Sequence, residues 1–557
     1  MKRTLLFMLL VPVAALLGAC AKIVAPTGGP KDDTPPKQQK EEPANGSVNF
    51  TGSVIKISFD EFFSLNNPTE NILFSPPLEQ QPSYTVQNKT LVIKFKDTLR
   101  ANTTYNVVFS NCIQDYHESN KLNYYHYSFS TGSDIDTFTL SGVVRDARTL
   151  APSDNFFVFL YDRDVDSLPL SSLPLYLTKT QPDGTFHFQN IRAGSYKVFA
   201  LKDGNGNLLY DLPNEAVAFG DHPYEAHVTP PRDTSAHAPS GGDTARKVAL
   251  FSFVAADSVP VLMHYDNPAP GQYIFPYKAP VTQFEATPLD RDIPHFERTN
   301  RRRDTLTWYL KGPLTDTVTY LFLADGKADT VLITPYKSKK SQPRGAKTAQ
   351  AERMPVSILN KGHRFKPLTL VFPYPIRPSD SVEVARVTHH KSGADTSRFL
   401  LSVPDTLLTQ LPLPLTFEDK GNYSVLIADS VFFGYHGLTN DSLRIDFVTQ
   451  SEKDYGSLTM EYVLPDGDSP YIAQLWNGTL LLQEDVLTTS QTITYPHLDP
   501  GNYSILVVED TNGNGLWDTG DYHSKRQPET IHKFPKSIHI RAYWETEETF
   551  TIPVIRN

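Results

Sequence analysis

The chain has 557 residues, a formal net charge of -10 and a sequence pI near 5.9. This acidic balance gives no reason to expect nucleic acid as a partner. The length suits three to five domains, and the 44 prolines, 27 tyrosines and 32 phenylalanines favour short strands and turns over long helices.

The N-terminus has the pattern of an export signal. Lys2 and Arg3 precede an apolar stretch, Leu5 to Leu17, that is too short to span a bilayer comfortably. The sequence LGAC, which ends at Cys20, resembles the bacterial lipobox. That resemblance implies a signal peptide over residues 1–19 and lipidation of Cys20, which would anchor the protein to a membrane. An ordinary secretory signal with an incidental cysteine is the alternative.

Residues 20–46 are rich in proline, glycine and charge and have no apolar period, which predicts a flexible tether behind the anchor. Residues 47–132 then contain alternating segments such as Val54–Phe59 and Leu91–Phe95, which predict the short strands of a β-sandwich.

The order of the motifs DDTPP, PANGSVNFTGSVIKISFDEFFSL and YSFSTG resembles the S-layer-type bacterial Ig-like domain of a Bacteroidetes outer-membrane lipoprotein family. The resemblance implies a fold and a location, and little about activity. Residues 133–228 contain FTLSGVVRDARTL and DGTFHFQNIRAGSYKVFAL, which resemble the transthyretin-like or carboxypeptidase-regulatory sandwich.

The C-terminal part of the chain repeats this pair. RAGSYKVFALKDGNGNLLYD, from Arg192, aligns without a gap with DPGNYSILVVEDTNGNGLWD, from Asp499, and TTYNVVFSN, from Thr103, aligns with GNYSVLIAD, from Gly421. We therefore expect a second Ig-like domain and a second transthyretin-like domain. The predicted all-β, multidomain chain has a further β-sandwich at 247–335, linkers at 229–246 and 336–354, and the second pair at 355–450 and 451–557.

The segment DTNGNGLWDTGD fits the spacing of a calcium loop, with Gly515 at the sixth position. An ordinary turn between strands is the alternative. In the first copy Leu208 replaces this glycine and Asn214 replaces the last carboxylate, so we expect a structural calcium ion only at the second copy, and no other cofactor. The predicted ligands are Asp510, Asn512, Asn514, Leu516, Asp518 and Asp521, and the matching positions of the degenerate first loop are Asp203, Asn205, Asn207 and Asp211.

An arginine cluster and two tryptophans are each compatible with two different roles. Arg301–Arg303 form a basic cluster, which predicts either contact with a phosphate-bearing or acidic partner or a solvated loop. Trp517 and Trp544 either flank a ligand surface or fill a core.

The sequence contains none of the motifs GxSxG, HExxH or CxxC, and no phosphate-binding glycine loop. We therefore predict a non-catalytic binding or scaffolding lipoprotein, anchored to the outer membrane on its cell-surface or periplasmic face. Its expected partners are the membrane and an outer-membrane protein, of whose complex it would be an accessory subunit. The alternatives are an adhesion or glycan-binding surface protein and a hydrolase without a recognisable motif.

Overall fold

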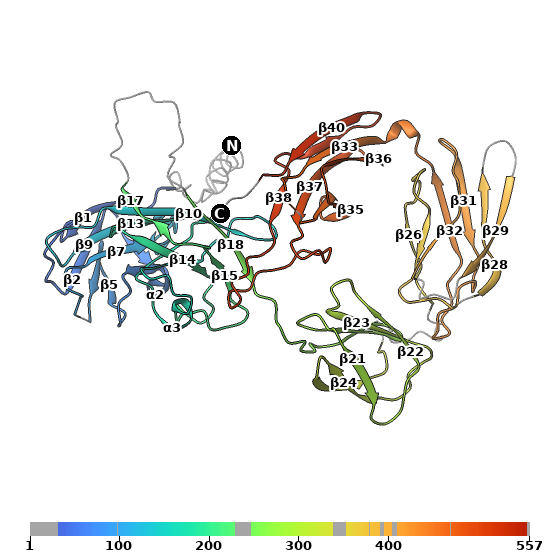
Figure 1. Cartoon of the computed structure of the whole chain (residues 1–557), viewed down its shortest axis with the longest axis horizontal. Helices are drawn as coiled ribbons and strands as arrows, with labels where there is room; N and C mark the ends of the chain where they lie inside the picture. The colour runs from blue at the N-terminus through green and yellow to red at the C-terminus, as the bar shows by residue number, and fades with distance from the viewer. Residues whose placement is uncertain are drawn as a thin grey trace, which may run out of the picture. The chain divides into compact units, whose positions relative to one another are not determined.

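The computed structural model describes residues 32–553 except positions 97, 229–246, 338–352, 378, 390–394, 404–408 and 468. The described chain is nearly all β, which confirms the predicted fold class (Figure 1). Its helical elements are single turns, α2 (Pro68–Asn71), α3 (Leu168–Ser171) and η1 (Glu452–Asp454), and none of the described helices has the length and apolar character to cross a membrane. The predicted signal peptide, Cys20 and the linker at 229–246 lie outside the described residues.

The chain divides into two compact units. The first runs to Val144 and includes Ser153–Leu209 and His222–Leu250, and the second includes Arg145–Pro152, Tyr210–Asp221 and the chain from Phe251 on. Within the units we name five groups of strands domains A to E, in chain order.

Domain A pairs a four-stranded sheet, ordered β1-β2-β6-β5, with a three-stranded sheet, ordered β4-β7-β9, and a short β3–β8 ladder. Alternation buries Ile55, Ile57 and Phe59 on one face of β2. The strands are β1 (Gln38–Glu42), β2 (Val54–Phe59), β3 (Phe63–Leu65), β4 (Ile72–Ser75), β5 (Ser83–Gln87), β6 (Thr90–Lys94), β7 (Thr104–Phe109), β8 (Ile113–Asp115) and β9 (Tyr125–Ser130).

The first strand corrects the predicted tether. The sequence QQKEE has no apolar alternation, which predicts a tether, yet Gln38–Glu42 pairs antiparallel with β2, with Glu41 opposite Ile57. A polar strand is stable at this position because it forms the edge of the sheet, where backbone pairing does not require buried side chains. The folded domain therefore begins at least nine residues before the predicted start at residue 47.

Domain B contains two sets of strands and a connecting pair. Strands β11 (Phe157–Tyr161), β12 (Tyr176–Lys179), β14 (Ser195–Leu201) and β16 (Tyr224–Glu225) pair together, as do β10 (Phe138–Asp146), β13 (Thr185–Ile191) and β17 (His227–Val228). The remaining strands, β15 (Ala216–Phe219) and β18 (Val248–Val254), pair with Val217 opposite Phe253. Both of these residues belong to the second compact unit, and the domain start at residue 247 stays a prediction.

Domain C is the predicted sandwich between the repeats. Its sheets, ordered β19-β20-β23-β22 and β21-β24-β25, enclose a core in which the ring of Trp308 lies edge-on to Phe275 and Tyr320. The strands are β19 (Asp266–Ala269), β20 (Gln272–Pro276), β21 (Phe284–Pro288), β22 (His295–Thr299), β23 (Thr305–Leu310), β24 (Val318–Ala324) and β25 (Lys327–Ile333).

Domain D has sheets ordered β26-β27-β30 and β29-β28-β31-β32. One pairing differs from domain A: β29, the fourth strand of domain D, pairs with β28, whereas β5 of domain A pairs with β6. The strands are β26 (Ser357–Leu359), β27 (Thr369–Val371), β28 (Ser379–His389), β29 (Asp395–Val403), β30 (Gln410–Pro412), β31 (Asn422–Ile427) and β32 (Leu443–Val448).

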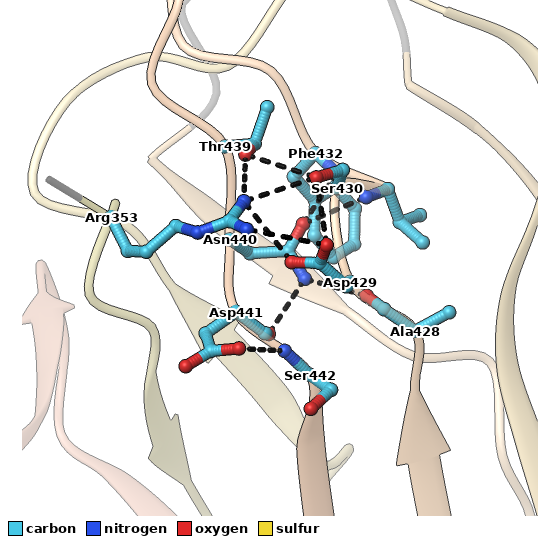
Figure 2. A network of polar contacts seen from close by, with 10 residues as sticks. Arg353, Ala428, Asp429, Ser430, Phe432, Thr439, Asn440, Asp441 and Ser442 are labelled. Atoms are coloured by element: carbon cyan, nitrogen blue, oxygen red, sulfur yellow. Dashed lines mark hydrogen bonds and ion pairs between the residues drawn. The ribbon is translucent and has the colours of Figure 1, made fainter. Parts of the chain in front are cut away.

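A polar network ties the start of domain D to the loop between β31 and β32. Figure 2 shows Arg353 directed at this loop, where its guanidinium donates to Ser430 (3.1 Å) and Thr439 (2.6 Å). The buried amide of Asn440 accepts from two backbone N–H groups and donates to two carbonyls, so it is fully satisfied. Arg353 and Met354, which were predicted to end a linker, therefore belong to the domain.

Domain E has one sheet ordered β36-β33-β40 and another ordered β35-β34-β37-β38, with β39 also paired to β37. The strands are β33 (Gly456–Val463), β34 (Tyr471–Asn477), β35 (Leu480–Leu487), β36 (Gln491–Leu498), β37 (Gly501–Glu509), β38 (Ile531–Lys533), β39 (Ile538–Ile540) and β40 (Glu545–Thr551).

Domains A and D share hydrogen bonds at equivalent sequence positions. The Tyr105 hydroxyl accepts from the N–H of Arg100 (2.8 Å), and the Tyr423 hydroxyl accepts from the N–H of Glu418 (2.8 Å). The Thr131 hydroxyl donates to the carbonyl of Arg100, and the hydroxyl of its counterpart Thr449 donates to the carbonyl of Glu418, both at 2.6 Å. The repeat seen in the sequence therefore has the same local geometry in both copies.

Domains B and E share an irregular register. In domain B Phe138 pairs with Ile191 and Leu140 with Phe188, which leaves a bulge in β13. In domain E the equivalent residues, Gly456 with Leu498 and Leu458 with Tyr495, show the same shift. A tyrosine hydroxyl in each copy also donates to the carbonyl four residues earlier, from Tyr196 to Arg192 (2.8 Å) and from Tyr503 to Asp499 (2.7 Å).

The shared hydroxyl can be tested at Thr449. The substitution Thr449→Val keeps the shape but removes the acceptor of the buried Gly421 N–H (2.8 Å), so we expect a loss of about 1–3 kcal/mol of stability in domain D. Hydrogen exchange of the β31 and β32 amides measures this domain alone. Thr492→Val, on an exposed position of β36, is the matched control. Equal protection in both variants would contradict the prediction.

Candidate binding site beside the C-terminal loop

The predicted calcium loop folds around one buried carboxylate. Asp510 follows β37, is 2% exposed, and accepts from the backbone N–H groups of Asn514 (3.1 Å) and Gly515 (2.8 Å). Gly515 has a φ of 75°, in the left-handed region that favours glycine. The loop therefore turns at the residue that the calcium template requires to be glycine.

The next loop residues gather on Asp518. The side-chain oxygens of Asn512 and Asn514 accept from the N–H groups of Asn514 (3.0 Å) and Leu516 (2.7 Å). Their amide nitrogens both donate to the Asp518 carboxylate, from Asn514 at 2.7 Å. The structure thus joins Asp510, Asn512, Asn514 and Asp518 in one hydrogen-bonded loop.

Asp521, predicted at the twelfth position, has other partners. Its carboxylate accepts from the N–H of His523 (3.0 Å) and from the hydroxyl of Ser524 (2.6 Å). The Ser524 hydrogen bond holds the pKa of Asp521 below its ordinary value, although partial burial opposes the shift. Asp521 thus caps the turn that follows the loop.

A carboxylate that the sequence analysis missed closes the loop. Glu529 is 6% exposed and accepts from the N–H (2.8 Å) and hydroxyl (3.0 Å) of Thr511 and from the N–H of Asp518 (3.0 Å). Burial raises its pKa, and these hydrogen bonds oppose the shift. The indole of Trp517 donates to the Glu529 carbonyl (2.8 Å), so this side chain helps to hold the loop in place.

The ligand types of this loop fit calcium, because carboxylate, amide and carbonyl oxygens are the donors that calcium takes. A carboxylate that accepts two hydrogen bonds still has lone pairs for a cation. However, the part of the chain that the structure describes holds no group of three or more His, Cys, Asp or Glu side chains arranged for a metal. Calcium therefore stays a prediction, with Asp510, Asn512, Asn514 and Asp518 and the Leu516 carbonyl as its candidate ligands.

The first loop has the same internal bonding. Asp203 accepts from the N–H groups of Asn205 (3.2 Å), Gly206 (2.7 Å) and Leu208 (2.8 Å), and Asn205 and Asn207 accept from the N–H groups two residues on. Leu208 adopts a φ of 60° where domain E has Gly515. Buried Glu215 accepts from the N–H of Asp211 (3.3 Å), as Glu529 does from Asp518. The carboxylate-centred turn therefore forms in both copies from the protein's own hydrogen bonds.

A pocket of about 490 Å³ lies beside the second loop. Its floor is the outer face of β34, β35, β37 and β38, with Trp476 and Leu506, and its rim includes Leu516 and Trp517 of the loop. Three cations line it, Arg148, Arg302 and Lys533. All lining residues belong to the second compact unit. Aromatic and aliphatic walls with a few polar groups are the usual composition of a ligand pocket.

The polar side of this pocket is a chain of hydrogen bonds. The Trp476 indole donates to Gln474 (3.2 Å), Gln474 donates to Glu484 (2.9 Å), and Glu484 accepts from Arg301 (2.6 Å). Arg301 also donates to the carbonyl of Gly515. Of the predicted basic cluster, Arg301 therefore joins the loop to β35, whereas Arg302 lines the pocket.

The calcium prediction can be tested at Asp518. Asp518→Asn keeps an oxygen for the amide donors but removes a charge, so we expect little change in Tm in chelator and a smaller rise of Tm when calcium is added. Asp521→Asn, outside the Asp518 network, should keep the rise of the parent. Differential scanning fluorimetry across a calcium titration measures both. A parent that shows no rise would leave the loop without an ion.

Domain A matches a known family of protein domains. A model described as "Bacterial Ig-like domain" matches residues 32–131, which confirms the Ig-like prediction and includes β1. No curated protein matches. The transthyretin-like character of domains B and E and the membership of the lipoprotein family stay predictions.

Three solved structures are similar over long stretches. The S-layer protein rSbsC(31-844) is 11% identical, covering 90% of this chain and 66% of that chain, with a TM-score of 0.13. Native alpha-2-macroglobulin from Escherichia coli, domains MG0-NIE-MG1, is 12% identical, covering 50% and 97%, with a TM-score of 0.19. The ICAM-5 D1-D4 ectodomain fragment is 7% identical, covering 74% and 98%, with a TM-score of 0.11.

Proposed function

We propose that the protein is a non-catalytic binding or scaffolding protein of the bacterial cell surface. The pocket beside the C-terminal loop carries this proposal. It joins an indole and aliphatic side chains to a polar rim with three cations, which suits an amphipathic or acidic group presented by a partner.

The reactive groups of a hydrolase are not gathered in this pocket. Its described lining contains one carboxylate, Glu484, and neither histidine nor cysteine. Both oxygens of Glu484 are engaged, one by Gln474 and the other by Arg301. A general acid–base pair needs two titratable groups at working distance. The composition therefore favours binding over the hydrolase alternative.

The proposal also includes a location at the outer membrane and a partner in that membrane. A lipid on Cys20 would hold the chain at the outer membrane, on its cell-surface or periplasmic face. A partner within the membrane fits an accessory subunit of an outer-membrane complex. The Ig-like match of domain A supports a surface protein, because many cell-surface domains have this sandwich architecture.

The partner is tested by purification of the full chain from detergent-solubilised outer membrane. We expect an outer-membrane protein to co-purify with the parent and to be lost with Trp476→Ala, which removes the indole from the floor of the pocket. Leu480→Ala, at a side chain that is 62% exposed and outside this pocket, is the control. The same set of proteins with parent and Trp476→Ala would remove the pocket from the proposal.

The anchor is tested separately at Cys20. Cys20→Ala removes the acceptor of the lipid, so we expect loss of labelled palmitate and release of the protein from the membrane fraction. Cys112→Ala is the matched control, because Cys112 is buried and its pKa is raised to about 12 by desolvation, which makes it unreactive. Membrane retention of Cys20→Ala would contradict the anchor.

A further inference from the structure

A turn between β39 and β40 exposes two aromatic side chains. Tyr543 is 73% exposed, the largest fraction among the large hydrophobic side chains of the described residues, and Trp544 is 61% exposed. Together they present a broad apolar surface to solvent. A surface of this kind is unfavourable in water, so its presence points to a ligand.

The turn leads into β40, which pairs parallel with β33 from Ser457 to Val463. Gly456 lies beside the turn, at the position that Phe138 has in domain B. A Cβ at Gly456 would lie 2.4 Å from the carbonyl of Arg541. The glycine thus makes room for the backbone of the turn, while the two aromatic side chains remain in solvent.

The turn is held rigidly in a strained conformation. The N–H of Tyr543 donates to the carbonyl of Tyr455 (2.7 Å), and the N–H of Ser457 donates to the carbonyl of Trp544 (3.0 Å). Tyr543 has a φ of 62°, which a bulky side chain rarely adopts. Strain that is maintained by hydrogen bonds while the side chain stays in solvent is typical of a binding surface.

The two rings border an open groove of about 1010 Å³. The lining also includes Tyr455 and His497, whose ring stacks on Phe365 at 3.6 Å between centroids. Lys453 lies over the Tyr543 ring (5.5 Å) and Arg541 over the Trp544 ring (5.5 Å), which fixes the orientation of both aromatic faces.

The charges of the groove are nearly balanced. Arg364 and Lys453 face Asp419, Glu452 and Glu545 along the lining, and Arg364 donates to Asp419 (3.3 Å). A balanced surface attracts neither a polyanion nor an anionic membrane. It offers planar carboxylate and guanidinium groups, which bond hydroxyl groups, next to aromatic faces, which cover apolar C–H surfaces. A sugar ring combines both kinds of surface.

We infer that this groove binds a neutral carbohydrate chain, with Tyr543 and Trp544 as stacking platforms. The inference rests on the proposed binding function and names the ligand class of a second site, which domain E shares with Arg364 and Asp419 of domain D. The groove volume of about 1010 Å³ leaves room for more than one sugar unit.

The test is affinity electrophoresis of the full chain, extracted in detergent, through gels that contain galactomannan, xyloglucan or dextran. We expect retardation in at least one gel and, for Trp544→Ala and for Tyr543→Gly, a dissociation constant about five- to tenfold higher. Tyr543→Gly is compatible with the left-handed backbone, so it should fold with an unchanged or higher Tm. Trp476→Ala, in the pocket beside the C-terminal loop, should be retarded like the parent.

Migration unaffected by all three polysaccharides, or equal retardation of parent, Trp544→Ala and Tyr543→Gly, overturns the inference. Co-sedimentation with phosphatidylcholine–phosphatidylglycerol vesicles that is lost in these variants, without polysaccharide binding, overturns it in favour of a membrane surface. The proposed function fails by a different readout, the co-purified protein that depends on Trp476, so the two failures are distinguishable.

Discussion

Buried side-chain oxygens that accept backbone N–H groups hold the loops of this chain. A protein made of short strands ends its backbone ladders many times, and each end leaves donors that need partners. Asp115 accepts from four successive N–H groups, Asp510 from two, and the Thr449 hydroxyl from one. Because the cores of adjacent sheets depend on the register that these loops set, the loops are structural elements as much as the strands.

The duplicated domains separate what the fold needs from what it does not. The tyrosine and threonine bonds, the bulge at β13 and β36, and the carboxylate-centred turn recur in both copies, although most side chains between them differ. Other positions differ between the copies: Gly515 stands where domain B has Leu208, and Gly456 stands where domain B has Phe138. Both glycines still serve the fold, because Gly515 adopts a φ of 75° and a Cβ at Gly456 would lie 2.4 Å from the carbonyl of Arg541.

Sequence reasoning predicted the all-β class, the repeat and the loop at Asp510, because apolar alternation and fixed spacing are local signals. It missed β1, whose polar residues pair at an edge, and the pairing of β18 with β15, because strand partners are set by contacts distant in sequence. It also missed Glu529, which lies 11 residues after Asp518. Asp521 fitted the spacing of a calcium loop, but its carboxylate accepts a hydrogen bond from the hydroxyl of Ser524 in the turn that follows.

Domain E contributes to both candidate recognition surfaces, and their lining shows which residues to vary. Glu215 lies four residues after Asp211, and Glu529 lies 11 residues after Asp518, so the second loop is longer before its buried carboxylate. The rim of the pocket includes Gly515, Leu516 and Trp517, which precede Asp518 in the loop. The turn before β40 borders the groove. Both segments are held by buried carboxylate or backbone acceptors. Variants that alter their exposed side chains should therefore change binding while the shared network preserves the fold.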